Sequence, residues 1–74
     1  MLVIVHCFAS LAEFQPDPPE MELPDGAKVA DVLTRLGLPE RAQIVILLDK
    51  GSASPDTPLR HGAHLELLPI VEGG

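Results

Sequence analysis

Only one segment of this chain has the periodicity of a helix, and it is short. Between Lys28 and Leu36, apolar residues recur at the i, i+3, i+4 and i+7 spacing of an amphipathic stripe: Val29, Val32, Leu33 and Leu36. Gly37 is placed to end this helix in the left-handed conformation. A chain of 74 residues forms one domain at most. A single short helix must therefore cover whatever sheet the rest of the chain forms.

Three runs are aliphatic nearly throughout and predict strands covered on both faces: residues 2–8, 44–48 and 64–68. Residues 20–23 alternate polar and apolar, which predicts a half-buried strand. Residues 49–58 are rich in turn formers and predict a loop, with one turn of helix near residues 56–59. One helix cannot cover both faces of such a sheet. An exposed apolar patch is therefore expected, which marks a partner site, unless the loop over residues 11–19 covers it.

The charge of the chain excludes several classes of partner. A net charge of −6 argues against nucleic acid and against anionic membranes, because both are bound mainly through Lys and Arg. It favours a basic protein partner, although solubility alone also explains it. One cysteine permits no internal disulfide, and no apolar run has the length of a membrane helix or the form of a signal peptide. We expect a cytoplasmic protein.

The chain ends with two glycines directly after the last predicted strand. Chance gives a terminal Gly-Gly in only about 0.5% of chains. Together with the order of elements, this ending resembles the MoaD/ThiS family of ubiquitin-like sulfur carriers. The similarity extends over the whole chain and is carried by four segments: 8–13, 23–29, 57–62 and 68–74. Within the family, Phe8-Ala9-Ser10-Leu11 and Pro69 are more similar to the MoaD type, the small subunit of molybdopterin synthase.

The resemblance implies an α+β fold of the β-grasp (ubiquitin-like) type, with a mixed sheet of four to five strands packed on one main helix. It divides the chain into a domain over residues 1–68 and a flexible tail over residues 69–74. The chain departs from the family at three points: Pro69-Ile70 stands in place of two prolines, Gly62-Ala63 in place of Gly-Asp, and Lys28 in place of Thr. These departures weaken the assignment to one pathway and leave the fold unchanged.

The resemblance also implies a reaction cycle at Gly74. A partner adenylating enzyme of the MoeB/ThiF type uses ATP to activate the terminal carboxylate, and sulfide from a persulfide donor replaces AMP to give a thiocarboxylate. A carboxyl terminus is ionised at neutral pH, and two glycines fit a narrow channel. The tail residues expected to enter a partner are Pro69, Ile70, Val71, Glu72 and Gly73. The chain is then a carrier that binds no cofactor or metal and is no enzyme by itself.

Other reactive side chains have plainer interpretations. Cys7 lies in an apolar strand, where a free thiol is usually a small hydrophobe. His61 and His64 have a spacing that chelates metal on a helix, but they flank a turn, which favours solvated histidines. His6 is expected on the sheet surface or at a partner interface. Scattered acidic residues form either a docking face or plain solvated charge: Asp25, Asp31 and Glu40.

The sequence is compatible with more than one sulfur acceptor. The leading interpretation is sulfur transfer to molybdopterin, in molybdenum or tungsten cofactor synthesis, with a MoaE-type large subunit as second partner. An alternative is thiamine thiazole, with a thiazole synthase as partner, or another sulfur-containing metabolite. Another class is a ubiquitin-like modifier, whose Gly74 would join a substrate lysine. The last is a plain β-grasp binding module with an accidental Gly-Gly end.

Overall fold

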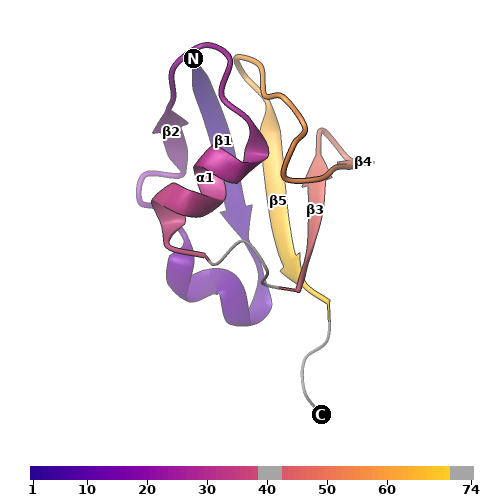
Figure 1. Cartoon of the computed structure of the whole chain (residues 1–74). Coiled ribbons are helices and arrows are strands. Elements are labelled where there is room, and N and C mark those ends of the chain that lie inside the picture. Colours follow the sequence, from indigo (N-terminus) through magenta and orange to yellow (C-terminus); the bar gives the residue numbers. More distant parts are fainter. Residues whose placement is uncertain (39–42, 71–74) are drawn as a thin grey trace.

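In the computed structural model, the first and last strands of the chain lie side by side at the centre of one five-stranded sheet (Figure 1). The structure describes residues 1–38 and 43–70. The strands are β1 (Leu2–Cys7), β2 (Glu20–Glu22), β3 (Ile44–Leu48), β4 (Gly51–Ser52) and β5 (His64–Pro69). The helices are η1, a 3-10 helix over Ala9–Phe14, and α1 (Val29–Leu36).

The sheet is mixed, in the order β2-β1-β5-β3-β4. β1 and β5 pair in parallel, with Val5 beside Leu65 and Cys7 beside Leu67. The other three pairings are antiparallel. Because a parallel pair needs a long connection, β2, α1, β3 and β4 all lie between β1 and β5 in the sequence. The predicted mixed sheet on one main helix is confirmed.

The core lies between one face of the sheet and α1. Val3, Val5, Leu65 and Leu67 on the central strands are 0% exposed, as are Val29 and Val32 of the helix. The apolar stripe of the predicted helix is thus the face that α1 buries. Among the described residues, no buried side chain is polar or charged, and the buried ones are aliphatic apart from Cys7.

The ends of α1 are fixed by local contacts. At its start, the Asp31 carboxylate accepts a hydrogen bond of 2.7 Å from the backbone N–H of Lys28, which satisfies a donor that the helix itself leaves free. At its end, Gly37 has φ +84°, and its N–H donates to the carbonyls of Leu33 and Thr34. The predicted left-handed termination at Gly37 is therefore confirmed.

Burial along β1 alternates, so the prediction that this strand is covered on both faces is wrong. Val3 and Val5 are buried, whereas Leu2 and His6 are exposed. The reason is that both helices lie on one side of the sheet: Leu11 of η1 joins the same buried cluster as α1. The opposite side, called the open face below, is the exposed second face that the single helix predicts.

The segment expected to be a plain loop between the first two strands is partly ordered by η1 and by one glutamine. The Gln15 side chain donates a hydrogen bond of 2.8 Å to the Val5 carbonyl and accepts one of 2.7 Å from the Cys7 N–H. This amide therefore takes the place of a strand partner for β1 beyond the end of β2. The segment packs against the edge of β1 and does not cover the open face.

The connection between β3 and β5 differs from the predicted loop. β3 turns at Asp49 and Lys50, which have φ +50° and +73°, and returns as the two-residue strand β4. The helical turn expected near residues 56–59 is wrong. A bend stands there instead, in which the Thr57 N–H donates to the Ser54 carbonyl, and Pro58 then bridges to Lys28.

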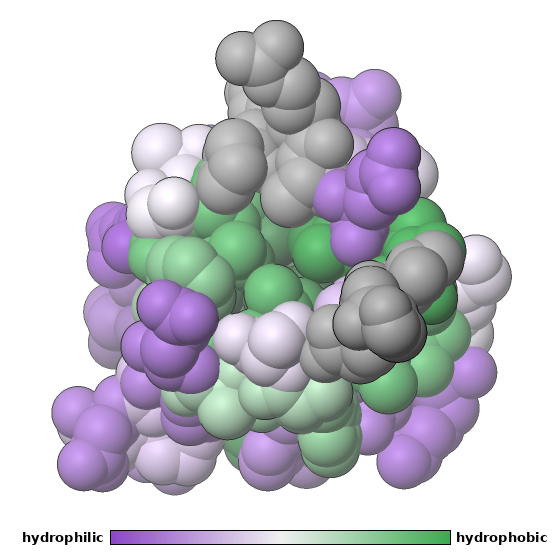
Figure 2. Space-filling view, turned by 90° about the horizontal axis from the view of Figure 1, so that it is seen from below, coloured by the Kyte–Doolittle hydropathy of each residue, from purple (hydrophilic) through white to green (hydrophobic). Residues whose placement is uncertain are grey.

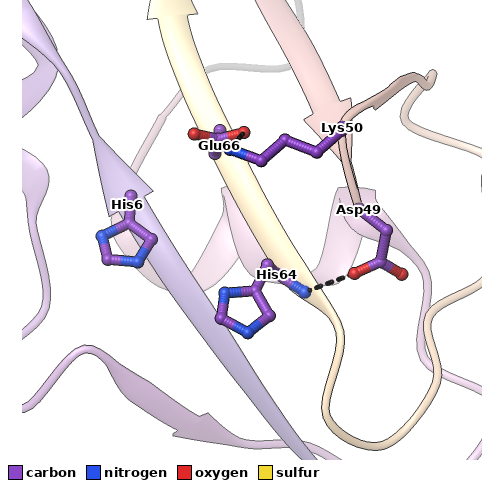
Figure 3. A pocket seen from close by; sticks show the side chains of 5 residues that line it. All are labelled: His6, Asp49, Lys50, His64 and Glu66. Carbon is purple, nitrogen blue, oxygen red and sulfur yellow. Dashed lines mark hydrogen bonds and ion pairs between the residues drawn. The ribbon is translucent and has the colours of Figure 1, made fainter.

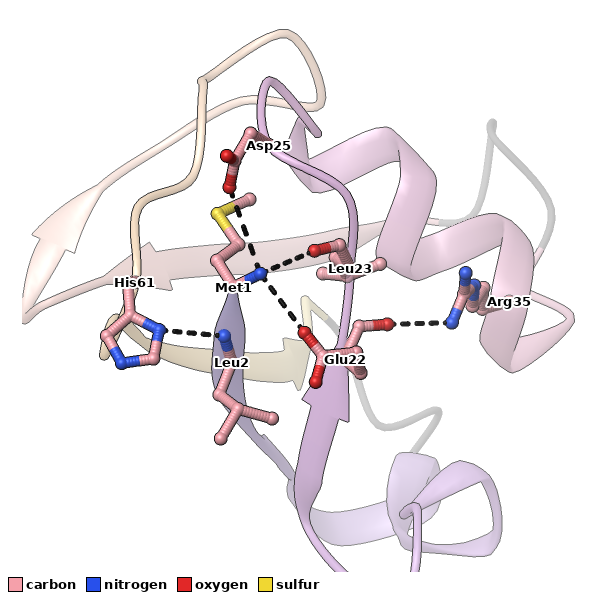
Figure 4. Close-up of polar contacts among 7 residues, drawn as sticks. All are labelled: Met1, Leu2, Glu22, Leu23, Asp25, Arg35 and His61. Atoms are coloured by element: carbon pink, nitrogen blue, oxygen red, sulfur yellow. Dashed lines mark hydrogen bonds and ion pairs between the residues drawn. The ribbon is translucent and has the colours of Figure 1, made fainter.

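The N-terminus is anchored to the β2 edge (Figure 4). The Met1 amine donates hydrogen bonds to the Leu23 carbonyl at 2.7 Å and the Glu22 carboxylate at 3.1 Å. The Leu2 N–H donates to His61 Nδ1 at 3.0 Å, and Arg35 donates to the Glu22 carbonyl at 2.9 Å. These contacts join β1 and β2 to the helix and to the turn before β5. In the part of the chain that the structure describes, no helix is long and apolar enough to cross a membrane.

The helix termination gives a first prediction. Gly37→Ala should lower the free energy of unfolding by about 1–2 kcal/mol, because a Cβ is strained at positive φ. Gly51→Ala is the matched control. Its φ is not in the left-handed region, and its Cβ would make an ordinary contact of 3.5 Å with the Leu48 carbonyl. Urea unfolding of both variants checks this, and an equal loss in the two would contradict it.

Candidate functional site

The strand that carries the tail ends one residue later than predicted. β5 continues to Pro69, which is half-buried and pairs with Ile44 of β3. The N–H of Ile70 then donates to the Gln43 carbonyl at 3.3 Å. The predicted tail residues Pro69 and Ile70 are thus held along the edge of β3. The other predicted site residues lie outside the described residues: Val71, Glu72, Gly73 and Gly74.

The place where the chain leaves the sheet is apolar. β1 and β5 end, and β3 begins, at the same end of the sheet, called the foot here (Figure 1). Of the four large hydrophobic residues that are exposed in the described part of the chain, three lie at this foot: Phe8 at 39%, Val45 at 40% and Ile70 at 53%. Figure 2 views the molecule from this end and shows hydrophobic side chains gathered there. We call these three residues the foot patch.

The foot patch continues onto the open face. Side chains alternate along a strand, so Phe8 is on the same side of β1 as His6, and their ring centroids are 6.3 Å apart. Leu68 of β5 pairs in register with Val45 and is half-buried between the strands. The open face is therefore apolar at the foot and more polar above it.

That polar part of the open face is hollowed (Figure 3). A hollow of about 390 Å³ is lined by five side chains from β1, β5 and the turn after β3: His6, Asp49, Lys50, His64 and Glu66. Lys50 approaches the Glu66 carboxylate at 3.8 Å. His6 is on the sheet surface, as expected. The sequence offered no signal for the hollow as a whole, because His6 and Glu66 are brought together only by the register of β1 and β5.

Asp49, which lines this hollow, is held by two hydrogen bonds. Its carboxylate accepts hydrogen bonds from the His64 N–H at 3.0 Å and from Arg60 at 3.1 Å. The backbone hydrogen bond from His64, followed by the interaction with Arg60, lowers the pKa of Asp49 below its ordinary value. The turn that begins at Asp49 is thereby fixed to the first residue of β5.

The other reactive side chains differ in their surroundings. Cys7 is buried, and this burial raises the pKa of its thiol, which disfavours the thiolate needed for a nucleophile. His61 accepts a backbone hydrogen bond, whereas His64 lies on β5, so these two do not act together. Among the described residues, no group of three or more His, Cys, Asp and Glu side chains is placed to hold a metal ion.

Two of the acidic residues of the predicted docking face, Asp25 and Asp31, line one hollow at the start of α1. Asp31 caps α1, and Asp25 lies 3.9 Å from the Met1 amine. Glu40 lies outside the described residues. The two that are described therefore have structural partners.

Solved structures identify the class of this fold. It is similar to the crystal structure of SAMP1 from Haloferax volcanii, at 24% identity and TM-score 0.78, over 100% of both chains. It is also similar to a candidate molybdopterin converting factor, subunit 1, from Pyrococcus furiosus, at 24% identity and TM-score 0.76, over 96% of this chain and 99% of that one. The HVO 2177 protein of Haloferax volcanii matches at 22% identity and TM-score 0.74, over 100% and 87%. The fold is a ubiquitin-like β-grasp.

The family follows from the sequence itself. The model of the ThiS family matches residues 5–74. The chain therefore belongs to the ThiS family, whose members are small ubiquitin-like sulfur carriers. A comparison with curated protein sequences finds no match.

The contacts of Asp49 give a prediction on acid stability. A carboxylate whose pKa is lowered by folding stabilises the fold above its unfolded pKa, which is about 3.9. This stabilisation is lost as the pH falls through the lower folded value. Asp49→Asn should therefore reduce the melting temperature at pH 7 and leave it nearly unchanged at pH 2. Asn tolerates the positive φ of this turn, so a difference of equal size at both pH values would contradict the electrostatic cause.

Proposed function

We propose that this chain is a sulfur carrier whose Gly74 carboxylate is adenylated and then converted to a thiocarboxylate. The observation that carries the proposal is the Gly73-Gly74 pair of a ThiS-family chain, which is separated by three residues from the end of β5, the strand that leaves the sheet at the foot patch. The acceptor we propose is the precursor of molybdopterin, in molybdenum or tungsten cofactor synthesis. The likeness to the Pyrococcus furiosus protein supports this choice.

The chemistry needs an accessible carboxylate and little else from this chain. The carboxylate oxygen attacks the α-phosphorus of ATP, pyrophosphate leaves, and an acyl-adenylate forms. Sulfide then attacks the acyl carbon, the bond to AMP breaks, and the thiocarboxylate remains. We infer that a MoeB/ThiF-type enzyme supplies the ATP site and the electrostatic stabilisation of these steps, because the carrier has no phosphate-binding loop of its own. The carrier supplies its carboxylate and a surface for docking.

The end of β5 sets how far the carboxylate reaches. Four residues follow Ile70, and four extended residues span at most about 14 Å. The partner must therefore dock close to the point where the chain leaves the sheet. The foot patch lies at that point and exposes three large hydrophobic side chains. We infer that the partner docks on the foot patch. Pro69 and Ile70 then direct the tail toward the partner, and Val71, Glu72 and Gly73 enter a channel in the partner.

The acceptor has a second candidate. The matching family model is that of ThiS, which favours transfer of sulfur to thiamine thiazole by a thiazole synthase. The two acceptors are separated by offering the thiocarboxylated protein to a MoaE-type large subunit with its pterin precursor, and to a thiazole synthase with its substrates. Sulfur in the pterin product supports our first choice. A modifier would instead produce conjugates in which Gly74 is joined to lysines of larger proteins.

The proposal predicts a change of mass at Gly74. Incubation with the cognate adenylating enzyme, ATP and sulfide should add about 16 Da, because one carboxylate oxygen is replaced by sulfur. One residue added after Gly74 should abolish this gain, because the activated carbon is then displaced. Gly74→Ala should reduce it by crowding the reacting carbon. Intact mass gives the result, and melting curves equal to wild type show that the fold is retained; a normal gain in the extended variant would overturn the proposal.

The foot patch gives a prediction on binding of the adenylating enzyme. Val45→Ser should weaken binding to the adenylating enzyme by about tenfold, because an apolar contact is lost from the interface. Leu2→Ser is the matched control, since Leu2 is 39% exposed but lies at the opposite end of β1. Calorimetric titration of both variants against the enzyme measures the effect. Equal weakening by the two would show that docking is not centred on the foot.

A further inference from the structure

The hollow on the open face contains a flat pair of imidazoles. His6 on β1 and His64 on β5 have ring planes only 15° apart and centroids separated by 6.4 Å, and both residues are exposed. Figure 3 shows the two rings side by side on the sheet. A flat ring surface favours planar groups that stack on it, and the guanidinium of arginine stacks in this way whereas an ammonium does not.

The carboxylate of Glu66 lies beside this pair. Glu66 is directly beside His6 in the sheet register, and its side chain is only 18% exposed. Among the described residues its recorded partner is Lys50, whose ammonium is 3.8 Å away on a side chain that is 85% exposed. An exposed ion pair of this length contributes little. The Glu66 carboxylate is therefore largely shielded from water. If a docked partner excludes the remaining water, this carboxylate needs a hydrogen-bond donor that binds it more strongly than Lys50 does.

The charge of the hollow favours a cation. The chain carries a net charge of −6. Of the two carboxylates that line the hollow, Asp49 is paired with Arg60 at 3.1 Å. In the described part of the chain, Glu66 has only the exposed Lys50 ammonium, at 3.8 Å. Asp49 already accepts hydrogen bonds from His64 and Arg60. Glu66 is thus the carboxylate of the hollow that can accept further hydrogen bonds. A guanidinium meets both demands, because it is planar, remains charged and binds carboxylates with two parallel hydrogen bonds.

We propose that this hollow receives an arginine side chain of the protein partner that docks on the foot patch, stacked on His6 and His64 and paired with Glu66. The site is continuous with the foot patch, because the ring of Phe8 lies 6.3 Å from that of His6. The proposal rests on the proposed function, since the partner is the enzyme that receives the tail. The foot patch supplies apolar contact area. The hollow adds selectivity, because it favours partners whose arginine lies as far from the apolar contact as the hollow lies from the foot patch.

The test compares variants in their affinity for the adenylating enzyme. Glu66→Gln should weaken binding by about tenfold or more, because it leaves the buried guanidinium without its counter-charge. Lys50→Gln should strengthen binding by about threefold, because it removes the cation that competes for Glu66. Asp56→Asn is the matched control. It removes one negative charge in the exposed loop beside α1 and should leave affinity within about twofold.

The opposite signs of the two main variants decide the question. If Glu66→Gln binds as wild type does, or if Lys50→Gln weakens binding as much as Glu66→Gln, the arginine site is overturned. Thiocarboxylate yield at saturating enzyme is measured in parallel. It should be retained in every variant, because the tail is unchanged. If the wild-type protein forms no thiocarboxylate, the proposed function is contradicted. The arginine site is then tested by the NMR titration described next, which needs no enzyme.

A measurement without the enzyme tests the site by itself. Acetyl-arginine amide is titrated into the protein while the ring proton signals of His6 and His64 are followed by NMR, with acetyl-lysine amide as the matched probe. The arginine probe should shift both signals, and Glu66→Gln should reduce the shift. Equal shifts with the two probes would show only general attraction to an acidic protein and would overturn the arginine site.

Discussion

The parallel pairing of β1 with β5 is the interaction on which the rest of the structure depends. It joins the two ends of the described chain at the centre of the sheet, where Val3, Val5, Leu65 and Leu67 have no exposed surface. It places the end of β5 beside the end of β1, so the tail leaves at the same place where Phe8 is exposed. It also brings His6 next to Glu66, two residues 60 positions apart in the sequence, and so creates the hollow. The proposed docking surface, the point where the tail leaves the sheet and the polar hollow all depend on the register of β1 with β5.

A single helix is the second constraint. One apolar stripe buries one face of a five-stranded sheet, and the other face stays in contact with solvent. A larger protein would cover that face with a second layer of helices. Here it carries a gradient along the strands, from the foot patch to the imidazoles and carboxylates above it. The face that the single helix leaves open thus combines the apolar area and the polar groups on which the proposed docking depends.

The sequence indicated the parts of the fold that rest on local patterns. The helix was predicted from four apolar residues at helical spacing and one glycine, and the aliphatic runs predicted the strands of the central sheet. Three features could not be predicted from the sequence: the exposed face of the strands, β4 and η1. Strands of Val, Ile and Leu have the same composition whether they are covered on one face or both, so the exposure of Leu2 and Val45 depended on which side the helices pack. The two-residue strand β4 is too short to leave a pattern, and η1 is held by Leu11 and Gln15, whose partners lie on other elements. The family resemblance predicts Gly74 as the reactive residue, which lies outside the described residues, whereas the proposed site at His6, His64 and Glu66 required the strand register.

The last backbone hydrogen bond among the described residues joins the Ile70 N–H to the Gln43 carbonyl. It fixes the point beside β3 from which the distance to Gly74, four residues further along the sequence, is counted. In the proposed cycle, one enzyme loads the carrier and another unloads it. Both enzymes would then have to place their reacting groups at the same distance from the docking surface, although they catalyse different reactions. The reach of the tail is therefore a constraint that the carrier imposes on the active sites of both partners.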